Sequence, residues 1–375
     1  MTQQSDRIRI GITQGDVNGV GPELIVKVLS NPEILELFTP VVFGNSEVFR
    51  KAAQTTGNED FGIHVIEDAE EISDGRVNFV EVGEKEAPHT PGVPSREGGD
   101  AALAALEAAS EAMARGEFDL LVTAPIDKNS IQGEKFAFTG HTEYLEDKFV
   151  TEGGKALMIL AADGLRVSLV TTHIPVSEVA SHITKDSVAR AIRSFNSALK
   201  MDFGCERPKI AVLSLNPHAG DGGLIGREEI EEITPAIEEC KKEGIMALGP
   251  IPADGLFGSG AYRNFDGVLA MYHDQGLAPF KAIAGAEGVN FTAGLDIVRT
   301  SPDHGTAYDK AGKGMADDTS MREAIYAAID IARRRDRYLE ASENPLPIKL
   351  QEPRGKKPQK DKDAANQADM AKKEE

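Results

Sequence analysis

Short apolar runs recur along the chain, and most are followed by a polar or glycine-rich turn and then by a helical pattern. Strands are predicted at residues 7–13, 118–123, 165–172, 208–215 and 267–272, and helices at 100–115 and 322–338. Strands that alternate with helices along a chain usually pair in parallel. The pattern therefore predicts an α/β fold with a mainly parallel sheet.

Three histidines lie just beyond the predicted strands. His173 and His273 each follow a strand directly, and His218 comes three positions after another. Because the carboxyl ends of parallel strands meet at one edge of a sheet, we expect the three side chains at that edge. Three neutral imidazoles on a divalent ion leave a coordination position open, as in catalytic metal sites. The alternative for each is a hydrogen-bonded residue at a strand end. The histidines without this placement, predicted to be surface or capping residues, are His64, His89 and His182.

The segment after His273 carries polar groups suited to a small anion. Lys281, Asn290 and Arg299 have glycines between them, which predicts loops bending round the anion rather than one helix face. For the two cations, plain surface charge is the alternative. Asp254 and Asp274 are candidate carboxylates for orienting a ligand or handling a proton.

Two other segments could also meet an anion. His141 precedes Thr142 and Glu143 at a predicted helix start, where negative charge is favoured. The glycine-rich turn at residues 14–23 either offers backbone N–H groups to a phosphate or is a plain tight turn. Its glycines do not match the dinucleotide-binding fingerprint, so a Rossmann domain is not expected.

Composition limits the classes of function. The chain has 375 residues, enough for about two domains. Its formal net charge of -20 opposes nucleic-acid binding, although a cleft that concentrates lysine and arginine can still bind a small anion. Cys205 and Cys240 show no metal-type pairing, so reduced thiols in a cytoplasmic protein are expected.

The ends of the sequence support the same picture. The first residues lack the pattern of a signal peptide, and no apolar run is long enough to span a bilayer, so no membrane partner is expected. Residues 352–375 are rich in Lys, Asp, Gln and Ala, which predicts a disordered tail. Partner binding by this tail is the alternative.

A series of motifs in fixed order covers residues 11 to about 314. They are GITQGDVNGVGPE, VTAPIDK, FTGHTEYL, TTHIP, LNPHAGDGG, GPIPADGLF, YHDQGLAPFK, GVNFTAGL and VRTSPDHGTA. In this order they resemble the 4-hydroxythreonine-4-phosphate dehydrogenase family of the vitamin B6 pathway. The resemblance implies a two-domain α/β/α fold similar to isocitrate and isopropylmalate dehydrogenases, which bind NAD without a Rossmann domain.

The resemblance also implies an organisation and a site. One domain would combine residues 1–138 with 300–349, the second would span 139–299, and 350–375 would form the tail. The protein would be a homodimer with active sites at the subunit interface. One divalent ion (zinc, magnesium or cobalt) would be held by His173, His218 and His273, contributed by both subunits and catalytic together with Lys281. The substrate-binding positions that match are His141, Thr142, Lys281, Asn290 and Arg299.

The implied reaction is NAD(P)-dependent oxidation of 4-phosphooxy-L-threonine at C3, followed by decarboxylation to 3-amino-2-oxopropyl phosphate in pyridoxal 5'-phosphate biosynthesis. Three alternatives stay open. A paralogous dehydrogenase would act on 4-phospho-D-threonate or 4-phospho-D-erythronate, where a hydroxyl replaces the amine. A metal-dependent hydrolase would use the three histidines to activate water and would need no NAD. A non-catalytic binding module would leave the open metal site unexplained.

Overall fold

The computed structural model describes residues 7–83, 89–133, 136–138, 140–150 and 154–344. The chain divides into two compact units, residues 1–338 and 339–375, and the first contains the whole sheet. The predicted disordered tail lies outside the described residues. The predicted division of the first 349 residues into two domains stays a prediction. None of the described helices is long and apolar enough to cross a membrane.

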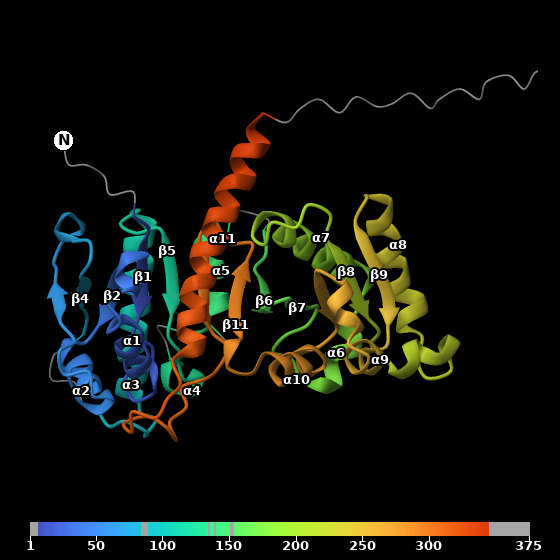
Figure 1. The fold of residues 1–375 in the computed structure, drawn as a ribbon. Helices are drawn as coiled ribbons and strands as arrows, with labels where there is room; N and C mark the ends of the chain where they lie inside the picture. Colours follow the sequence, from blue (N-terminus) through green and yellow to red (C-terminus); the bar gives the residue numbers. More distant parts are fainter. Residues whose placement is uncertain (1–6, 84–88, 134–135, 139, 151–153, 345–375) are drawn as a thin grey trace, which may run out of the picture. The chain divides into compact units, whose positions relative to one another are not determined.

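One large sheet organises the fold (Figure 1). Its strands stand in the order β3-β4-β2-β1-β5-β12-β11-β6-β7-β10-β8-β9. In chain order they are β1 (Arg9–Thr13), β2 (Thr39–Gly44), β3 (Ile63–Val65), β4 (Val77–Glu81), β5 (Leu120–Thr123), β6 (Leu157–Ala162), β7 (Leu165–Leu169), β8 (Lys209–Leu213), β9 (Met246–Ile251), β10 (Gly267–Ala270), β11 (Val289–Ala293) and β12 (Val298–Pro302). The α-helices are α1 (Gly21–Leu29), α2 (Ser46–Thr56), α3 (Arg96–Ala114), α4 (Lys128–Ile131), α5 (His141–Phe149), α6 (Val176–His182), α7 (Lys185–Met201), α8 (Thr234–Lys242), α9 (Ala253–Gly258), α10 (His273–Ala284) and α11 (Thr319–Glu343).

The α/β class is confirmed, and the sheet is mainly parallel as predicted, but its centre is not. At one end of the sheet, the neighbouring strands β3, β4, β2, β1, β5 and β12 run parallel to one another. At the other end, β7, β10, β8 and β9 do the same. Between these blocks, β11 pairs antiparallel with both β12 and β6, and β6 pairs antiparallel with β7. Central antiparallel strands set the sheet apart from a Rossmann domain, whose sheet is mostly parallel.

Local side-chain signals fix where several helices begin. The Asn45 side chain accepts from the first amides of α2, and Ser95 does the same for α3. Thr184 and Ser187 form a reciprocal capping box at the start of α7. Each cap satisfies amide groups that have no partner within the helix. Pro22 stands in the first turn of α1, where its missing N–H costs no helical hydrogen bond.

The first glycine-rich turn is a buried structural turn. The Asp16 amide donates to the Pro125 carbonyl and the Val20 amide to the Thr306 carbonyl, both at 2.9 Å. Gly15 has φ +70°, and a Cβ there would lie 2.4 Å from the Pro125 oxygen, so only glycine fits. Because these amides are used inside the protein, the tight turn is favoured over the phosphate-binding alternative.

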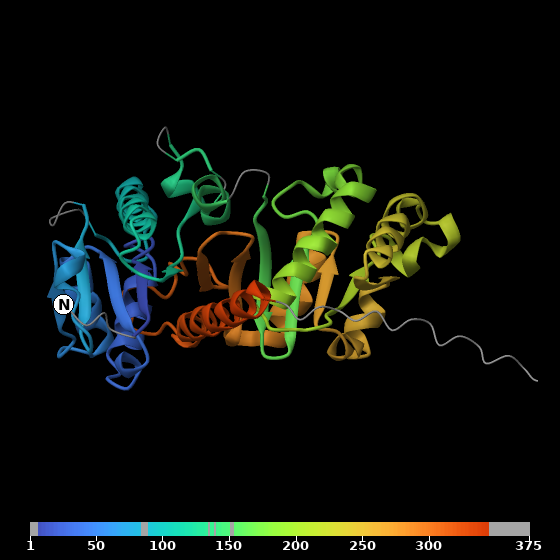
Figure 2. The ribbon, with the colours of Figure 1, turned by 90° about the horizontal axis from the view of Figure 1, so that it is seen from above.

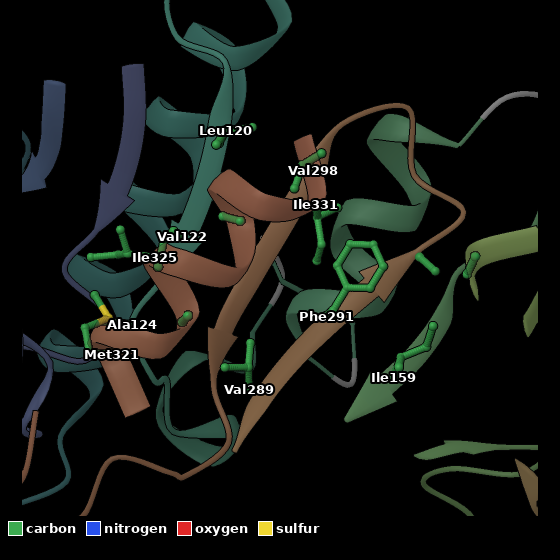
Figure 3. Close-up of a cluster of buried hydrophobic side chains, with 14 of the residues drawn as sticks. Leu120, Val122, Ala124, Ile159, Val289, Phe291, Val298, Met321, Ile325 and Ile331 are labelled. Carbon is green, nitrogen blue, oxygen red and sulfur yellow. The ribbon is translucent and has the colours of Figure 1, made fainter. Parts of the chain in front are cut away.

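Strand β11 divides apolar from polar side chains at the centre of the sheet. Val289, Phe291 and Ala293 belong to the largest hydrophobic cluster, whereas Asn290 and Thr292 point to the other face, since side chains alternate along a strand. Figure 3 shows the apolar side, where Val289, Phe291, Val298 and Ile159 gather with Met321, Ile325 and Ile331 of α11. Seen from above, α11 lies on one side of the sheet and α3 and α5 on the other (Figure 2).

The opposite face has two separate apolar clusters. One joins α3 and α5 to β2 and β5, and the other joins α9 and α10 to β7, β8 and β10. Between them lie the polar residues of β11 and β12. The sheet therefore presents a polar strip at its centre, flanked by packed helices on both sides.

Phe291 should be a main anchor of the central strands, because its ring is completely buried against helix α11. We predict that Phe291→Ala lowers the free energy of unfolding by about 3–5 kcal/mol, through lost burial and the cavity left behind. Leu37→Ala, at a side chain 48% exposed, should change it little. Urea unfolding of both variants measures this; equal effects would contradict the assignment of the core.

Candidate active site

A pocket of about 270 Å³ lies over the polar strip. Strands β5, β6, β11 and β12 form its floor, and helices α5 and α10 supply its sides. It brings together seven of the eight predicted site residues, which are His141, Thr142, His173, His273, Lys281, Asn290 and Arg299. A larger cavity of about 570 Å³ lies beside β3 and β4, and its lining contains none of these eight.

Arg299 is the most unusual residue of the pocket. Its side chain is 1% exposed, and its guanidinium donates to the Thr123 hydroxyl at 2.5 and 3.2 Å and to the Thr292 hydroxyl at 3.0 Å. Burial lowers the pKa of Arg299 to about 9, partly opposed by the nearby Glu143 carboxylate. The threonine hydroxyls orient the cation without bringing negative charge, and Glu143 offsets the effect of burial only in part, so the guanidinium remains suited to a bound anion.

Two neighbours of Arg299 have unsatisfied polar atoms. Within the described part of the chain, His141 Nε2 and Asn290 Oδ1 are buried and make no hydrogen bond. The pKa of His141 lies well below its ordinary value, first because of burial and then because of Arg299 and Lys128. Buried polar atoms in proteins almost always have a partner, so these atoms mark places where a bound molecule would complete the pairing.

Lys281 stands on helix α10 and faces the loop after β12. Its ammonium donates to the Asp303 carbonyl at 2.8 Å and lies 3.4 Å from the Asp303 carboxylate. Burial raises the pKa of Asp303, and Lys281 opposes that shift. The sequence-based prediction of loops was wrong here, because Lys281 lies in a helix and Asn290 and Arg299 lie on strands. Alternation along the strands, rather than glycine-rich loops, points the last two into the pocket.

His173 and His273 lie side by side at the edge predicted for them. Strands β7 and β10 are parallel neighbours, and the ring centroids are 5.9 Å apart. Two imidazoles that share one ion at about 2.1 Å from each nitrogen have centroids roughly 5 Å apart, so the pair fits a divalent ion with a small adjustment. Asp274 Oδ1 lies 2.7 Å from His273 Nδ1, as carboxylates often do behind metal-binding imidazoles.

His218 is separate from this pair. Strand β8 is parallel to β10, as predicted, but His218 lies in another pocket, whose lining includes Asp254, Tyr272 and Gln275. Among the residues that the structure describes, no group of three His, Cys, Asp or Glu side chains could hold a metal ion within one chain. The imidazole of His218 is exposed.

Sequence reasoning overlooked three residues that shape the pocket. Thr123 and Lys128 both belong to the VTAPIDK motif at the end of β5, and Glu143 follows Thr142 in α5. The Lys128 ammonium lies 3.4 Å from His173 Nε2, and Glu143 Oε1 lies 3.7 Å from His173 Nδ1. For Thr123 and Lys128 the available signal was their position at and just after the end of a buried strand. Glu143 follows the predicted site residues His141 and Thr142 in α5. The pocket lining includes none of the three histidines set aside earlier, His64, His89 and His182.

Comparison with known proteins gives the family. The protein-family model described as "Pyridoxal phosphate biosynthetic protein PdxA" matches residues 36–328. A 4-hydroxythreonine-4-phosphate dehydrogenase of Bacteroides thetaiotaomicron is 53% identical over 346 residues, covering 92% of this chain and 94% of that protein. A protein of Cutibacterium acnes named "Putative D-threonate 4-phosphate dehydrogenase" is 39% identical, covering 86% and 94%.

Comparison with solved structures points to the same family. The crystal structure of 4-hydroxythreonine-4-phosphate dehydrogenase from Klebsiella pneumoniae superposes with a TM-score of 0.75 at 32% identity, over 88% of this chain and 99% of that one. The fold, the pocket and these similarities define an α/β oxidoreductase of the dehydrogenase class. Within that class, the chain belongs to the PdxA family, whose model matches most of its length.

The low pKa of His141 has a consequence for stability. Below its ordinary pKa of about 6.5, the unfolded chain binds a proton at this histidine that the folded protein does not bind, so stability falls as the pH falls. We predict that the wild type loses more free energy of unfolding than His141→Gln between about pH 7 and pH 5.5. Urea unfolding at both pH values tests this, and equal losses would contradict a neutral, buried imidazole.

Proposed function

We propose that the protein is an NAD(P)-dependent 4-hydroxythreonine-4-phosphate dehydrogenase. It oxidises the C3 hydroxyl of 4-phosphooxy-L-threonine, and the resulting β-keto acid loses CO₂ to give 3-amino-2-oxopropyl phosphate, which enters pyridoxal 5'-phosphate biosynthesis. One observation carries the proposal: a buried arginine that hydrogen-bonds to threonine hydroxyls shares a pocket with a pair of metal-capable histidines. The 53% identical relative bears the same activity in its name.

The charges of the pocket suit a molecule with an anionic group at each end. Arg299, fixed by Thr123 and Thr292, holds one anionic group, with neutral His141 beside it. Lys281, fixed by Asp303, supplies a second positive charge from helix α10. A substrate held at both ends keeps its C3 hydroxyl in one place, which converts binding energy into orientation.

Apolar side chains in the lining of the pocket exclude water. Met158 and Leu160 on β6 and Leu277 on α10 border the same pocket. They reduce the water around the bound substrate, so the fixed charges act more strongly on it.

A divalent ion fits the histidine pair, with His173 and His273 as two of its ligands. Bound there, it would act as a Lewis acid that lowers the pKa of the alcohol and stabilises the charge left when CO₂ departs. A nicotinamide cofactor, when bound beside the pocket, would supply the acceptor for the hydride that leaves C3. The amides of Asp16 and Val20 in the first glycine-rich turn are paired inside the protein, so these two groups are not offered to the cofactor.

We infer that the third ligand, His218, comes from the partner subunit of a homodimer. The separation of His218 from the other two histidines within one chain supports this assignment. Near it, Leu224 is 82% exposed, and Ile225 and Ile230 are also exposed. Apolar side chains gathered beside an exposed imidazole are typical of a surface that a second subunit covers.

A paralogous activity on 4-phospho-D-threonate or 4-phospho-D-erythronate is the second candidate. The relative named for D-threonate 4-phosphate matches this chain at 39% identity over nearly its whole length, so the family includes both names. The substrates differ in whether an amine or a hydroxyl stands beside the carboxylate, and one or two contacts decide between them.

The function is tested by NADH formation with metal-loaded protein and the three substrates measured side by side. We predict a kcat/KM for 4-phosphooxy-L-threonine at least about a hundredfold above that for either sugar acid, because a site that pairs a substrate amine rejects a hydroxyl analogue strongly. Preference for a sugar acid would identify the paralogous activity. Metal binding without NADH formation on any of the three would contradict the dehydrogenase assignment.

Mixing of inactive variants tests the shared site. His173→Ala and His218→Ala should each be inactive alone, since each removes one ligand from every site. After unfolding and joint refolding, half of the dimers are mixed, and each mixed dimer has one intact site, so about a quarter of the wild-type activity should return. Recovery of no activity, with mixed dimers verified by two affinity tags, would contradict a site built from two subunits.

A further inference from the structure

The turn that carries His218 has an uncommon backbone. His218, Ala219 and Asp221 have φ of 53°, 53° and 45°, and Gly220 and Gly222 between and after them are also in the left-handed region. Non-glycine residues in this region are strained and persist only where the surrounding structure holds them.

The Glu229 carboxylate accepts the hydrogen bonds that hold this turn. Its side chain is 2% exposed, at the start of a short π-helical segment (Glu229–Ile233) that leads into α8. One carboxylate oxygen accepts from the backbone amides of Leu215 and Asn216, at 2.8 and 2.7 Å. The other oxygen accepts from the Asn216 side-chain amide at 3.0 Å. Glu229 thus fixes the two residues through which the chain enters the His218 turn.

The turn also packs directly on this carboxylate. A Cβ added to Gly220 would lie 2.7 Å from Glu229 Oε2, and one added to Gly226 would lie 2.3 Å from the Asn216 amide nitrogen. The Asn216 amide donates to Glu228 Oε2 as well, at 2.7 Å. The two glycines therefore let the turn close on a buried carboxylate, and the carboxylate contacts both the beginning and the middle of the turn.

We propose that Glu229 is a positioning residue for His218: it holds the left-handed turn in the form that presents the imidazole to the metal ion. This inference rests on the proposed function, in which His218 is the third ligand. Both carboxylate oxygens of Glu229 accept hydrogen bonds from the turn, so Glu229 is not assigned as a ligand of substrate, cofactor or metal. It acts through the backbone of Leu215 and Asn216, much as groups behind metal ligands set ligand orientation in other proteins.

The substitution Glu229→Gln isolates this role. Glutamine has the same shape, but one of its two terminal atoms is a donor, and both positions now face donors. Asn216 cannot compensate by turning its amide over, because its oxygen would then face the Glu228 carboxylate. At least one hydrogen bond of the turn is lost in either orientation.

The experiment measures zinc binding to the full-length protein by calorimetry after treatment with a chelator. We expect Glu229→Gln to bind zinc about tenfold more weakly than wild type. The amides of Leu215 and Asn216 should exchange with deuterium faster, while the melting temperature of the metal-free protein changes little. Glu231→Gln is the matched control, since the same change is made in the same segment at an exposed carboxylate that pairs with Arg227.

His218→Ala separates the possible outcomes. Loss of zinc affinity in His218→Ala with wild-type affinity in Glu229→Gln would overturn the positioning role and leave the ligand assignment intact. Unchanged affinity in His218→Ala would overturn the assignment itself and the inference with it. Equal weakening by Glu231→Gln would show a general charge effect and would also overturn it. If Glu229→Gln does not fold, Asn216→Ala, which removes the amide contacts to both carboxylates, carries the same test.

Discussion

The burial of the Arg299 guanidinium is the constraint on which the site depends. Removing a charged group from water costs several kcal/mol unless other groups replace the lost solvation. This cost is comparable to the whole free energy of unfolding of a domain. Here the replacement is partial: Thr123 and Thr292 supply hydroxyl oxygens without charge, and the nearby Glu143 carboxylate opposes the effect of burial only in part. A bound anion completes the solvation of the guanidinium. Substrate binding therefore offsets the desolvation cost of Arg299, and this contributes to the affinity for the substrate.

Side chains of the central strands alternate between the two faces of the sheet, and this alternation makes the burial of Arg299 possible. Arg299 on β12 points to the polar face, while its neighbours Val298 and Thr300 face the core, where the Thr300 hydroxyl donates to the Ala324 carbonyl of α11. Strand β11 does the same with Phe291 and Asn290. The apolar side holds the strands rigidly, so the polar side can place its groups accurately, as preorganised binding requires.

The sequence predicted the parts of the site that depend on local pattern. Apolar runs located strands β7, β8 and β10, and because parallel strands share an edge, His173 and His273 were correctly placed together. Arg299 was assigned to a loop, since strands β11 and β12 are short and carry no strong signal. Its partner Thr123 lies 176 residues away in the chain, a contact that no local pattern reveals. The position of His218 likewise depends on a turn shaped by Glu229, a residue whose role is visible only in three dimensions.

The most direct test of the account is a crystal structure of the zinc-loaded protein with 4-phosphooxy-L-threonine. We predict that an anionic group of the ligand lies within hydrogen-bonding distance of the Arg299 guanidinium, with His141 Nε2 and Asn290 Oδ1 now paired. An ordered ligand bound elsewhere, for example in the cavity beside β3, with Arg299 still contacting only its two threonines, would contradict the central claim.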